Sequence, residues 1–325
     1  MTHTVTLIPG DATGPEIAAA VRQIIAAAGV HIHWDVQPLQ NGDIPNDLVE
    51  SIRKNGLALM GHHAGAGDPD APPPIVRLRK ELGLFANIRP VRSISGIPTR
   101  HNELDLVVIR ESTEDIYAHL EHESIPGVFE SLKVTTRAAC ERIIRYAFEY
   151  ARKSGRKKVT IVHKANIMKK SDGLFLKIGR DIALQYPDIA SEDVIVDALC
   201  MKLVIAPQKF DVLVTGNLYG DIVADLTAGL AGGSSNCPSI NVGPSNTVFA
   251  AARGDAKNFA GPDQGNVLSL LMPALSLLTH LEEHEAAAKI LRATNHVLVS
   301  GTKPFALGGS ASTSAFTATI CGCFA

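Results

Sequence analysis

The sequence predicts an α/β fold, and three observations support this prediction. Short apolar segments alternate with helix-length segments along the chain, which is the pattern of strands and helices following one another. The 325 residues are 46% hydrophobic, enough for a large core that divides into two domains. The chain has no internal repeat or low-complexity tract that would indicate a solenoid or a disordered tail.

Segment length and composition assign the elements. The expected strands are 5–9, 31–37, 57–61, 105–109, 158–162, 193–196 and 210–215. The expected helices are 17–28, 46–54, 135–153, 172–185, 266–281 and 284–299. The segments 69–74 and 232–246 are rich in Pro, Gly and Ser, so we expect loops there, and ordered loops of this kind often carry a site.

The composition argues against several function classes. The formal net charge is −2, with 31 basic and 33 acidic residues, so no overall field attracts nucleic acid or a membrane surface. No apolar run approaches the roughly 18 residues that a membrane helix needs. The polar start Met1–Thr4 lacks the charged and apolar regions of a signal peptide, so we expect a cytoplasmic protein. Five scattered cysteines indicate neither a disulfide framework nor a zinc site.

The first predicted strand passes into a helix through the glycine turn Gly10–Glu16. This arrangement resembles a nucleotide-binding unit, but the dinucleotide fingerprint G-x-G-x-x-G is absent here and in the rest of the chain. If a nucleotide binds, we expect a loop of another kind to hold it.

Two carboxylates four residues apart, Asp221 and Asp225, follow the buried strand 210–215 and share one face of the next helix. Ile222, Leu226 and Leu230 recur at the same interval, which predicts that their side of the helix is buried. Ligands of open α/β sheets bind at the carboxyl ends of strands, and paired carboxylates suit Mg²⁺ or Mn²⁺. The alternative is that Asp221 caps the helix and Asp225 is solvated.

Cationic residues also stand at predicted strand ends. Arg89 and Arg110 each close an apolar segment, and a guanidinium fork matches a carboxylate, so several such arginines indicate a polycarboxylate substrate. Each of them can instead pair with a local acid such as Glu81 or Glu111. Lys164 follows the strand 158–162 and is either a general base or a surface residue. Asn166 accompanies it, and Asp197 is a third acid beyond a strand.

Five motifs together resemble the metal-dependent β-decarboxylating dehydrogenases, the family of isocitrate, 3-isopropylmalate and homoisocitrate dehydrogenases. They are Ile8–Glu16, Phe85–Pro90, Arg110–Tyr117, His163–Met168 and Asn217–Asp225. The likeness runs over nearly the whole chain and is closest to the NAD-linked isocitrate dehydrogenases. It implies a two-domain fold with a shared mixed sheet: a discontinuous cofactor domain of residues 1–94 and 237–325, and an inserted domain of residues 95–236 for dimerisation, metal binding and catalysis.

The resemblance also implies a role for each matching residue. Arg79, Arg89 and Arg110 would hold the malate part of the substrate, with Asn166 and Asn217 lining the site. Asp221, Asp225 and Asp197 would bind Mg²⁺ or Mn²⁺, Lys164 would remove the hydroxyl proton, and Tyr117 would protonate the enolate. Lys164 and Asp197 would come from the partner subunit of a homodimer. The implied reaction is oxidation of a 2-hydroxy acid by NAD(P)⁺ followed by loss of CO₂.

The segment that would read the substrate's third arm departs from the family. Isocitrate dehydrogenases carry a serine and an asparagine where this chain has Pro73 and Ile75, and these cannot donate to a carboxylate. Ile75 matches a position where isopropylmalate enzymes place a leucine, and Arg77 is an additional cation. We therefore expect a malate with an apolar or differently anionic arm, such as a phosphonate bound by Arg77.

The segment that would bind the cofactor departs further. The family's His-Gly-Ser/Thr-Ala-Pro block is replaced by a sequence that begins at Arg253 and Gly254. Asn258 and Phe259 occupy the pair that selects the cofactor and match neither the NAD nor the NADP pattern. Asn266 and Asn217 complete the implied cofactor residues. The overall likeness favours NAD over NADP, although Arg253 and Lys257 would suit a 2′-phosphate.

Two other readings stay open. One is a tartrate- or malate-type dehydrogenase whose substrate has little or no third arm, which Pro73 and Ile75 would tolerate. The other belongs to another class: a noncatalytic regulatory or binding subunit, suggested by the altered loop 253–259. The presence of Tyr117, Lys164 and all three aspartates argues against a purely binding role.

Overall fold

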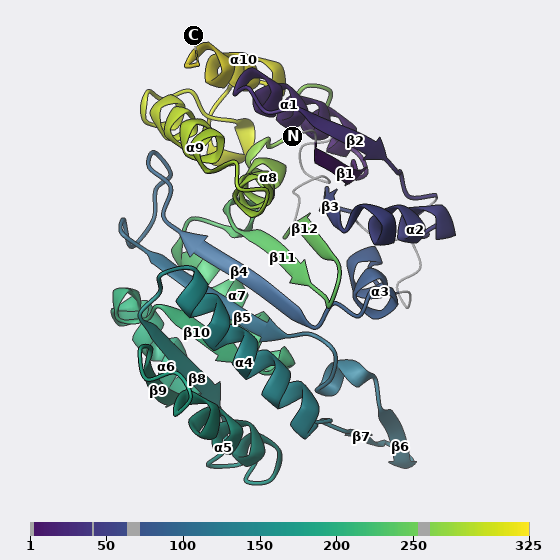
Figure 1. Ribbon diagram of the computed structural model, residues 1–325, viewed down its shortest axis with the longest axis vertical. Coiled ribbons are helices and arrows are strands. Elements are labelled where there is room, and N and C mark those ends of the chain that lie inside the picture. Colours follow the sequence, from purple (N-terminus) through teal and green to yellow (C-terminus); the bar gives the residue numbers. More distant parts are fainter. Residues whose placement is uncertain (1–2, 41, 64–71, 253–260, 325) are drawn as a thin grey trace. The chain divides into compact units, whose positions relative to one another are not determined.

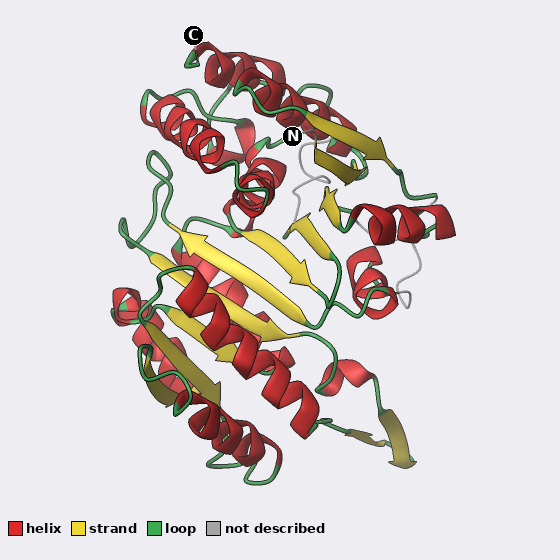
Figure 2. Cartoon of the chain, in the orientation of Figure 1, coloured by secondary structure: helices red, strands yellow, loops and turns green. Residues whose placement is uncertain are grey.

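The computed structural model describes residues 3–40, 42–63, 72–252 and 261–324. The chain divides into two compact units, which we call the terminal unit (Met1–Leu82, Ser93–Asn102 and Ala231–Ala325) and the inserted unit (Gly83–Arg92 and Glu103–Leu230). Each unit contains strands flanked by helices, so the α/β prediction is confirmed (Figures 1 and 2).

The unit boundaries differ from the expected 94/95 and 236/237. The strand Ala86–Arg92 belongs with the inserted unit because it pairs antiparallel with Asp105–Glu111 over seven residue pairs. The assignment of the units to cofactor binding and to dimerisation stays a prediction.

The terminal unit contains five strands in the spatial order β2-β1-β3-β12-β11. Their bounds are β1 His3–Ile8, β2 Ile32–Val36, β3 Leu57–Met60, β11 Pro238–Val242 and β12 Thr247–Ala251. All neighbours are parallel except β11, which runs antiparallel to β12. The sequence analysis assigned 232–246 to a loop, and this is wrong for β11, which lies in a stretch rich in Pro, Gly and Ser and carries the polar Ser239 and Asn241 at buried positions.

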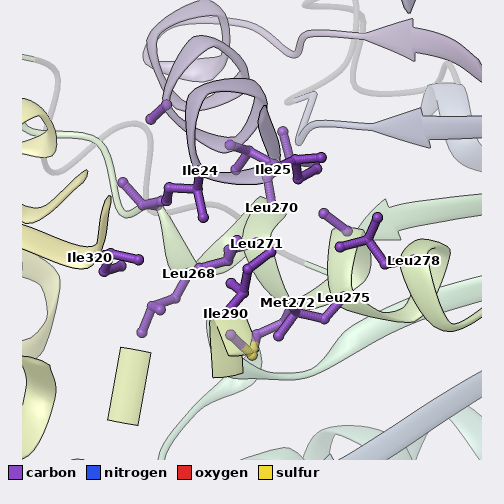
Figure 3. Packing of buried hydrophobic residues seen from close by; sticks show 14 of the residues in the cluster. Ile24, Ile25, Leu268, Leu270, Leu271, Met272, Leu275, Leu278, Ile290 and Ile320 are labelled. Carbon is purple, nitrogen blue, oxygen red and sulfur yellow. The ribbon is translucent and has the colours of Figure 1, made fainter. Parts of the chain in front are cut away.

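Helices pack around a large apolar core in the terminal unit. They are α1 Gly14–Ala27, α2 Asn46–Asn55, α3 Pro74–Glu81, α8 Leu268–His280, α9 His284–Val299 and α10 Thr313–Gly322, with short 3₁₀ turns at Ser234–Asn236 and Phe305–Leu307. Figure 3 shows side chains of α1, α8, α9 and α10 meeting in this core. Ten of the thirteen residues of α8 are buried, which explains its almost continuous apolar sequence. Within the described ranges, no helix combines the length and apolarity that crossing a bilayer requires.

The inserted unit contains five strands in the order β4-β5-β10-β8-β9. Their bounds are β4 Ala86–Arg92, β5 Asp105–Glu111, β8 Lys158–His163, β9 Ala190–Ile195 and β10 Val212–Thr215. Only β4 is antiparallel to its neighbour, so the carboxyl ends of β5, β10 and β8 lie at one edge. The helices are α4 Arg137–Lys153, α5 Ser171–Ala183, α6 Val196–Ile205 and α7 Asn217–Leu230, with 3₁₀ turns at Ile116–Ala118 and Pro207–Lys209.

A separate two-stranded hairpin, β6 Glu121–Ile125 and β7 Val128–Ser131, belongs to the inserted unit and was not predicted. Figure 1 shows it standing apart from the helices of that unit. Every residue in it is exposed, and the side chains include Ile125 and Phe129 at 63% and 69% exposure. An isolated hairpin with exposed apolar side chains is marginally stable, so this one is suited to packing against another surface.

Gly96 permits close packing within the terminal unit and gives a stability prediction. Its φ is +89°, and a Cβ there would lie 2.6 Å from the carbonyl carbon of Leu298 on α9. Gly29, in the same unit, has φ +95° but open space around it. Replacing either glycine by alanine lowers the free energy of unfolding by about 1–2 kcal/mol, because alanine has to adopt a left-handed backbone conformation. Gly96→Ala should lower the free energy of unfolding by a further 1–3 kcal/mol, roughly, because its Cβ would be overpacked against α9.

Urea unfolding followed by circular dichroism measures this difference, with Gly29→Ala as the matched control. Equal losses of unfolding free energy in the two variants would contradict the close contact between the 93–102 segment and α9.

Candidate active site

The helix α7 lies unusually close to β5 because of one glycine. A Cβ at Gly220 would collide with Thr215 Oγ1 and would fall 2.5 Å from the Cγ of Arg110. The buried face of α7 is formed by small residues, including Ala224, Thr227 and Ala228. The predicted burial is therefore confirmed for Leu230 and wrong for Ile222, which is 52% exposed, while Leu226 is half-buried.

Arg110 is buried at the end of β5 and contacts the start of α7. Its Nε donates to Asn217 Oδ1 at 2.8 Å, and its Nη1 donates to Asp221 Oδ1. The hydroxyl of Tyr117 donates to the other oxygen, Asp221 Oδ2, at 2.5 Å, and the guanidinium lies over the tyrosine ring. Arg110 thus pairs with Asp221 rather than with its neighbour Glu111, the local alternative left open by the sequence.

The turn that presents Tyr117 is held in a strained conformation. Asp115 has φ 79° and ψ −151°, a region that costs a non-glycine residue about 1–3 kcal/mol and that occurs at functional sites. Its carboxylate accepts from the backbone N–H of Ile116 at 2.9 Å and of Leu218 at 3.1 Å. Burial and the hydrogen bond to Asp221 raise the pKa of Tyr117, so the phenol keeps its proton at neutral pH.

A second guanidinium lies beside the second carboxylate of α7. Arg89 is buried, and its Nη2 lies 4.0 Å from Asp225 Oδ1. The sequence analysis placed Arg89 at the end of an apolar segment, whereas it lies in the middle of β4, which continues to Arg92. Asp221 and Asp225 each therefore have an arginine of the inserted unit close by.

Three other predicted substrate residues, Ile75, Arg77 and Arg79, lie on α3 of the terminal unit. Arg79 Nε donates to Asn241 Oδ1 of β11 at 2.8 Å. Ile75 is half-buried. Arg77, predicted to read an anionic arm, instead pairs with Asp43, with Nη1 and Oδ1 at 2.8 Å. In this structure the Arg77 guanidinium is thus already matched with an acid of its own unit.

Lys164 and Asp197 form a pair of their own. Lys164 follows β8, Asp197 lies in the first turn of α6, and Nζ lies 2.8 Å from Oδ1. The hydrogen bond from Lys164 is the main cause that lowers the pKa of Asp197. The Asp197 side chain is 69% exposed, and Asn166, in the turn after β8, is exposed as well. Of the two residues expected to act in the partner subunit, Asp197 is therefore exposed, whereas the Lys164 side chain is only 24% exposed.

The residues present fit a divalent cation only in part within one chain. Asp221 and Asp225 are both partly exposed, stand four residues apart on α7, and offer the hard oxygen ligands that Mg²⁺ or Mn²⁺ prefers. Within the described part of the chain, no three Asp, Glu, His or Cys side chains gather closely enough to hold a metal ion. Asp197 does not join the other two in one chain, so a complete site needs donors from elsewhere.

A small pocket in the terminal unit contains one of the predicted cofactor residues, Asn266. The glycine turn after β1 and the end of β3 form one side of it, and its lining includes Asp11, Gly14, His62, Gln264 and Asn266. Asn266 Nδ2 is buried and has no hydrogen-bond partner within the described residues, so it is a donor that is available to a ligand. Of the other predicted cofactor residues, Asn217 lies in the inserted unit, and Arg253, Gly254, Asn258 and Phe259 lie outside the described residues.

Sequence reasoning assigned no role to three polar residues of the inserted unit: Asp115, Lys133 and Asp172. Asp115 lies inside a motif that was recognised, but no role was assigned to it. Lys133 precedes α4, and Asp172 lies in the first turn of α5. The two side chains form an ion pair, with Nζ 2.9 Å from Oδ1. Asp172 stands in the first turn of its helix, which reads as an ordinary helix start, and Lys133 carries no sequence signal of burial.

The chain is similar to known proteins of one family. The family model for isocitrate/isopropylmalate dehydrogenase matches residues 4–320. A probable NAD isocitrate dehydrogenase subunit alpha, mitochondrial, from Drosophila melanogaster is 44% identical, with 98% of this chain and 87% of that protein covered. A chloroplastic 3-isopropylmalate dehydrogenase from Solanum tuberosum is 45% identical, with 92% and 86% covered.

The crystal structure of an isocitrate dehydrogenase from Methylococcus capsulatus superposes with a TM-score of 0.91 at 41% identity, with 99% of each chain covered. The expected fold is thus confirmed along nearly the whole chain. The protein belongs to the isocitrate/isopropylmalate dehydrogenase family of β-decarboxylating dehydrogenases.

Proposed function

We propose that the protein oxidises and decarboxylates a 3-substituted malate with NAD(P)⁺ and Mg²⁺ or Mn²⁺, yielding a 2-oxo acid and CO₂. One observation carries this proposal: the Asp221 carboxylate accepts hydrogen bonds from the buried guanidinium of Arg110 and from the protonated phenol of Tyr117, which come from two other segments of the inserted unit. Such a group of cation, acid and carboxylate suits a substrate that carries several carboxylates and needs a proton donor. The family assignment supports the reaction type, and the names of the relatives favour NAD.

Each side chain has a separate task in the proposed reaction. Arg79, Arg89 and Arg110 bind the substrate carboxylates through bidentate guanidinium contacts. Lys164 receives the hydroxyl proton as the carbinol carbon is oxidised, and Tyr117 gives its proton to the enolate that remains after CO₂ leaves. Asp221 and Asp225, with Asp197 of a second chain, would hold a cation that stabilises negative charge on the reacting oxygen. A nicotinamide cofactor, with Asn266 among its contacts, would accept the hydride.

Two observations support a narrower proposal for the third arm of the substrate. Pro73 and Ile75 offer no side-chain donor to a third carboxylate. Arg77 is paired with Asp43, which argues against a phosphonate held by that residue. We therefore propose an apolar arm, as in 3-isopropylmalate, or a short one, as in malate or tartrate.

A substrate panel tests this proposal. Isocitrate, homoisocitrate, 3-isopropylmalate, tartrate, malate and a phosphonomethyl malate are each assayed with NAD⁺ and with NADP⁺ in the presence of Mn²⁺, and CO₂ is measured beside reduced cofactor. We expect isocitrate to show kcat/KM about 10–10² lower than the best apolar-arm or short-arm acid, because its third carboxylate lacks a partner.

Isocitrate as the best substrate would overturn the proposed arm. Reduction of neither cofactor with any acid would overturn the enzyme assignment and favour the alternative, a regulatory or binding subunit. The preferred cofactor is read from the same panel. The cytoplasmic location stays a prediction.

The proton donor is tested with Tyr117→Phe, which removes the hydroxyl and keeps the ring over Arg110. We expect kcat to fall about 10²–10⁴-fold, the usual contribution of a general acid or base, with a small change in substrate KM. Steady-state kinetics measure both constants. Tyr150→Phe on α4 is the matched control, since it removes a buried phenol away from this cluster. A Tyr117 variant as active as this control would exclude Tyr117 as the acid.

We propose that the active form is a homodimer. Asp197 shares α6 with Met201 and Ile205, which are 55% and 68% exposed, and the neighbouring α7 exposes Ile222. Apolar side chains gathered on two packed helices beside an exposed metal-binding residue suit a second copy of the chain, whose Lys164 and Asp197 would complete the first site. The Drosophila relative is named as a subunit, so a heteromeric assembly is the competing arrangement.

Mixing two inactive variants tests whether Lys164 acts in the partner subunit. Lys164→Ala and Tyr117→Phe chains are unfolded together, refolded and assayed. If the proposal holds, each mixed dimer contains one intact site out of two. Random pairing of equal amounts makes about half of the dimers mixed, so activity should return to about a quarter of wild type.

No recovery in mixed dimers verified by native mass spectrometry would place Lys164 and Tyr117 of the same chain in one site. A protein that stays monomeric at assay concentration would exclude the homodimer itself.

A further inference from the structure

A buried ion cluster lies inside the inserted unit, next to the residues of the proposed reaction but not among them. Lys133 precedes α4, and its side chain is only 17% exposed. Its Nζ lies 2.9 Å from Asp172 Oδ1 and 3.5 Å from Asp115 Oδ2, and it sits over the ring of Tyr219 at 4.8 Å. Lys133 therefore joins two carboxylates that belong to different segments.

Asp172 connects this cluster to the segment that carries Lys164. Asp172 is buried in the first turn of α5, and its Oδ2 accepts from the backbone N–H of Lys164 at 2.6 Å. The carboxylate therefore fixes the chain at the residue where β8 ends and the Lys164 side chain departs toward Asp197.

Asp115 connects the cluster to two further segments. Its carboxylate accepts from Ile116 N–H, directly before Tyr117, and from Leu218 N–H in the first turn of α7. Its backbone also exchanges hydrogen bonds with Val134, the residue after Lys133, at 3.0 and 3.4 Å. Asp115 thus connects the segment before Tyr117, the start of α7 and the Lys133 segment. Its own backbone is in a strained conformation, with φ 79° and ψ −151°.

The charges around the cluster make Lys133 hard to replace. A small cavity here is lined by the carboxylates of Glu111, Glu114, Asp115 and Asp172, and among its described lining residues Lys133 is the only cation. Arg142 lies 3.7 Å from Glu111 but does not line the cavity. Without Lys133, the buried carboxylates of Asp115 and Asp172 would face one another without a positive charge between them.

We propose that Lys133 is a positioning residue. Its ammonium group pairs with the carboxylates of Asp115 and Asp172. These two carboxylates in turn hold the backbone at Lys164, before Tyr117 and at the start of α7 in the positions that the reaction needs. This inference rests on the proposed function for the roles of Lys164, Tyr117 and Asp221. The three segments follow β8, β5 and β10, and beyond these strands the backbone pairing of Asp115 with Val134 joins only the segment after β5 to the Lys133 segment. The ion cluster supplies that connection with three side chains.

Two measurements on the full-length protein test this inference. Lys133→Met keeps the length of the side chain and removes its charge, and Lys133→Arg keeps the charge. Asp172→Ala removes the acceptor of the Lys164 N–H and the nearer carboxylate of Lys133, while Asp115 still holds the Leu218 N–H. Lys177→Met on the exposed face of α5 is the matched control. Hydrogen exchange resolved to the amides of Lys164 and Leu218 reports the positions of the segments directly. Steady-state kinetics with the best acid of the panel report the reaction.

We expect Lys133→Met to speed exchange at both amides, while peptides of the terminal unit stay at wild-type rates. Its kcat should fall by up to about 10²-fold, the effect of a misplacement near 1 Å, and substrate KM should change little. Lys133→Arg should recover most of kcat. Asp172→Ala should speed exchange at Lys164 and leave Leu218 protected, and Lys177→Met should behave as wild type.

Unchanged exchange and kcat in Lys133→Met would overturn the inference, as would faster exchange spread evenly over both units. If Lys133→Met does not fold, Asp172→Ala carries the test, and a protected Lys164 amide in that variant would overturn it. An inactive wild type refutes the proposed function instead, and the exchange measurement still decides whether Lys133 holds the segments.

Discussion

The close approach of α7 to β5 is the constraint on which the rest of the candidate site depends. Gly220 leaves no room for a Cβ, so the helix packs directly over the Arg110 side chain. Because of this contact, the guanidinium reaches Asn217 at the start of α7 and Asp221 one turn further along the helix. Any residue larger than glycine at this position would push the helix outward and separate the carboxylate from its partners.

The parallel strands explain why the remaining groups gather nearby. β5, β10 and β8 end at one edge, and each continues into a segment that carries a polar residue: Tyr117, Asn217 and Lys164 respectively. Strands alone do not fix the path of the chain after their last residues, and the backbone N–H groups just beyond their ends are held by the buried carboxylates of Asp115 and Asp172. The exposed Asp197 and the apolar faces of α6 and α7 indicate that one chain presents only part of the arrangement.

The sequence predicted the α/β class and most regular elements because period and segment length directly reflect burial. It located α9 at 284–299, as observed. It did not find β11, which lies in a Pro-, Gly- and Ser-rich stretch with polar residues at buried positions, or the hairpin β6–β7, whose exposed side chains follow no burial pattern. The motifs identified Arg110, Tyr117 and Asp221, and the structure brings these three into contact. The pairing of Arg77 with Asp43 and the burial of Lys133 depend on contacts between distant segments, which local patterns do not encode.

The double engagement of Asp221 has a consequence for the order in which ligands bind. Arg110 and Tyr117 occupy both carboxylate oxygens, so any cation arriving there competes with a guanidinium and a phenol that are already seated. An anionic ligand that draws Arg110 toward itself would remove this competition. Uptake of the one would then strengthen uptake of the other, and by thermodynamic reciprocity the enhancement would be equal in both directions.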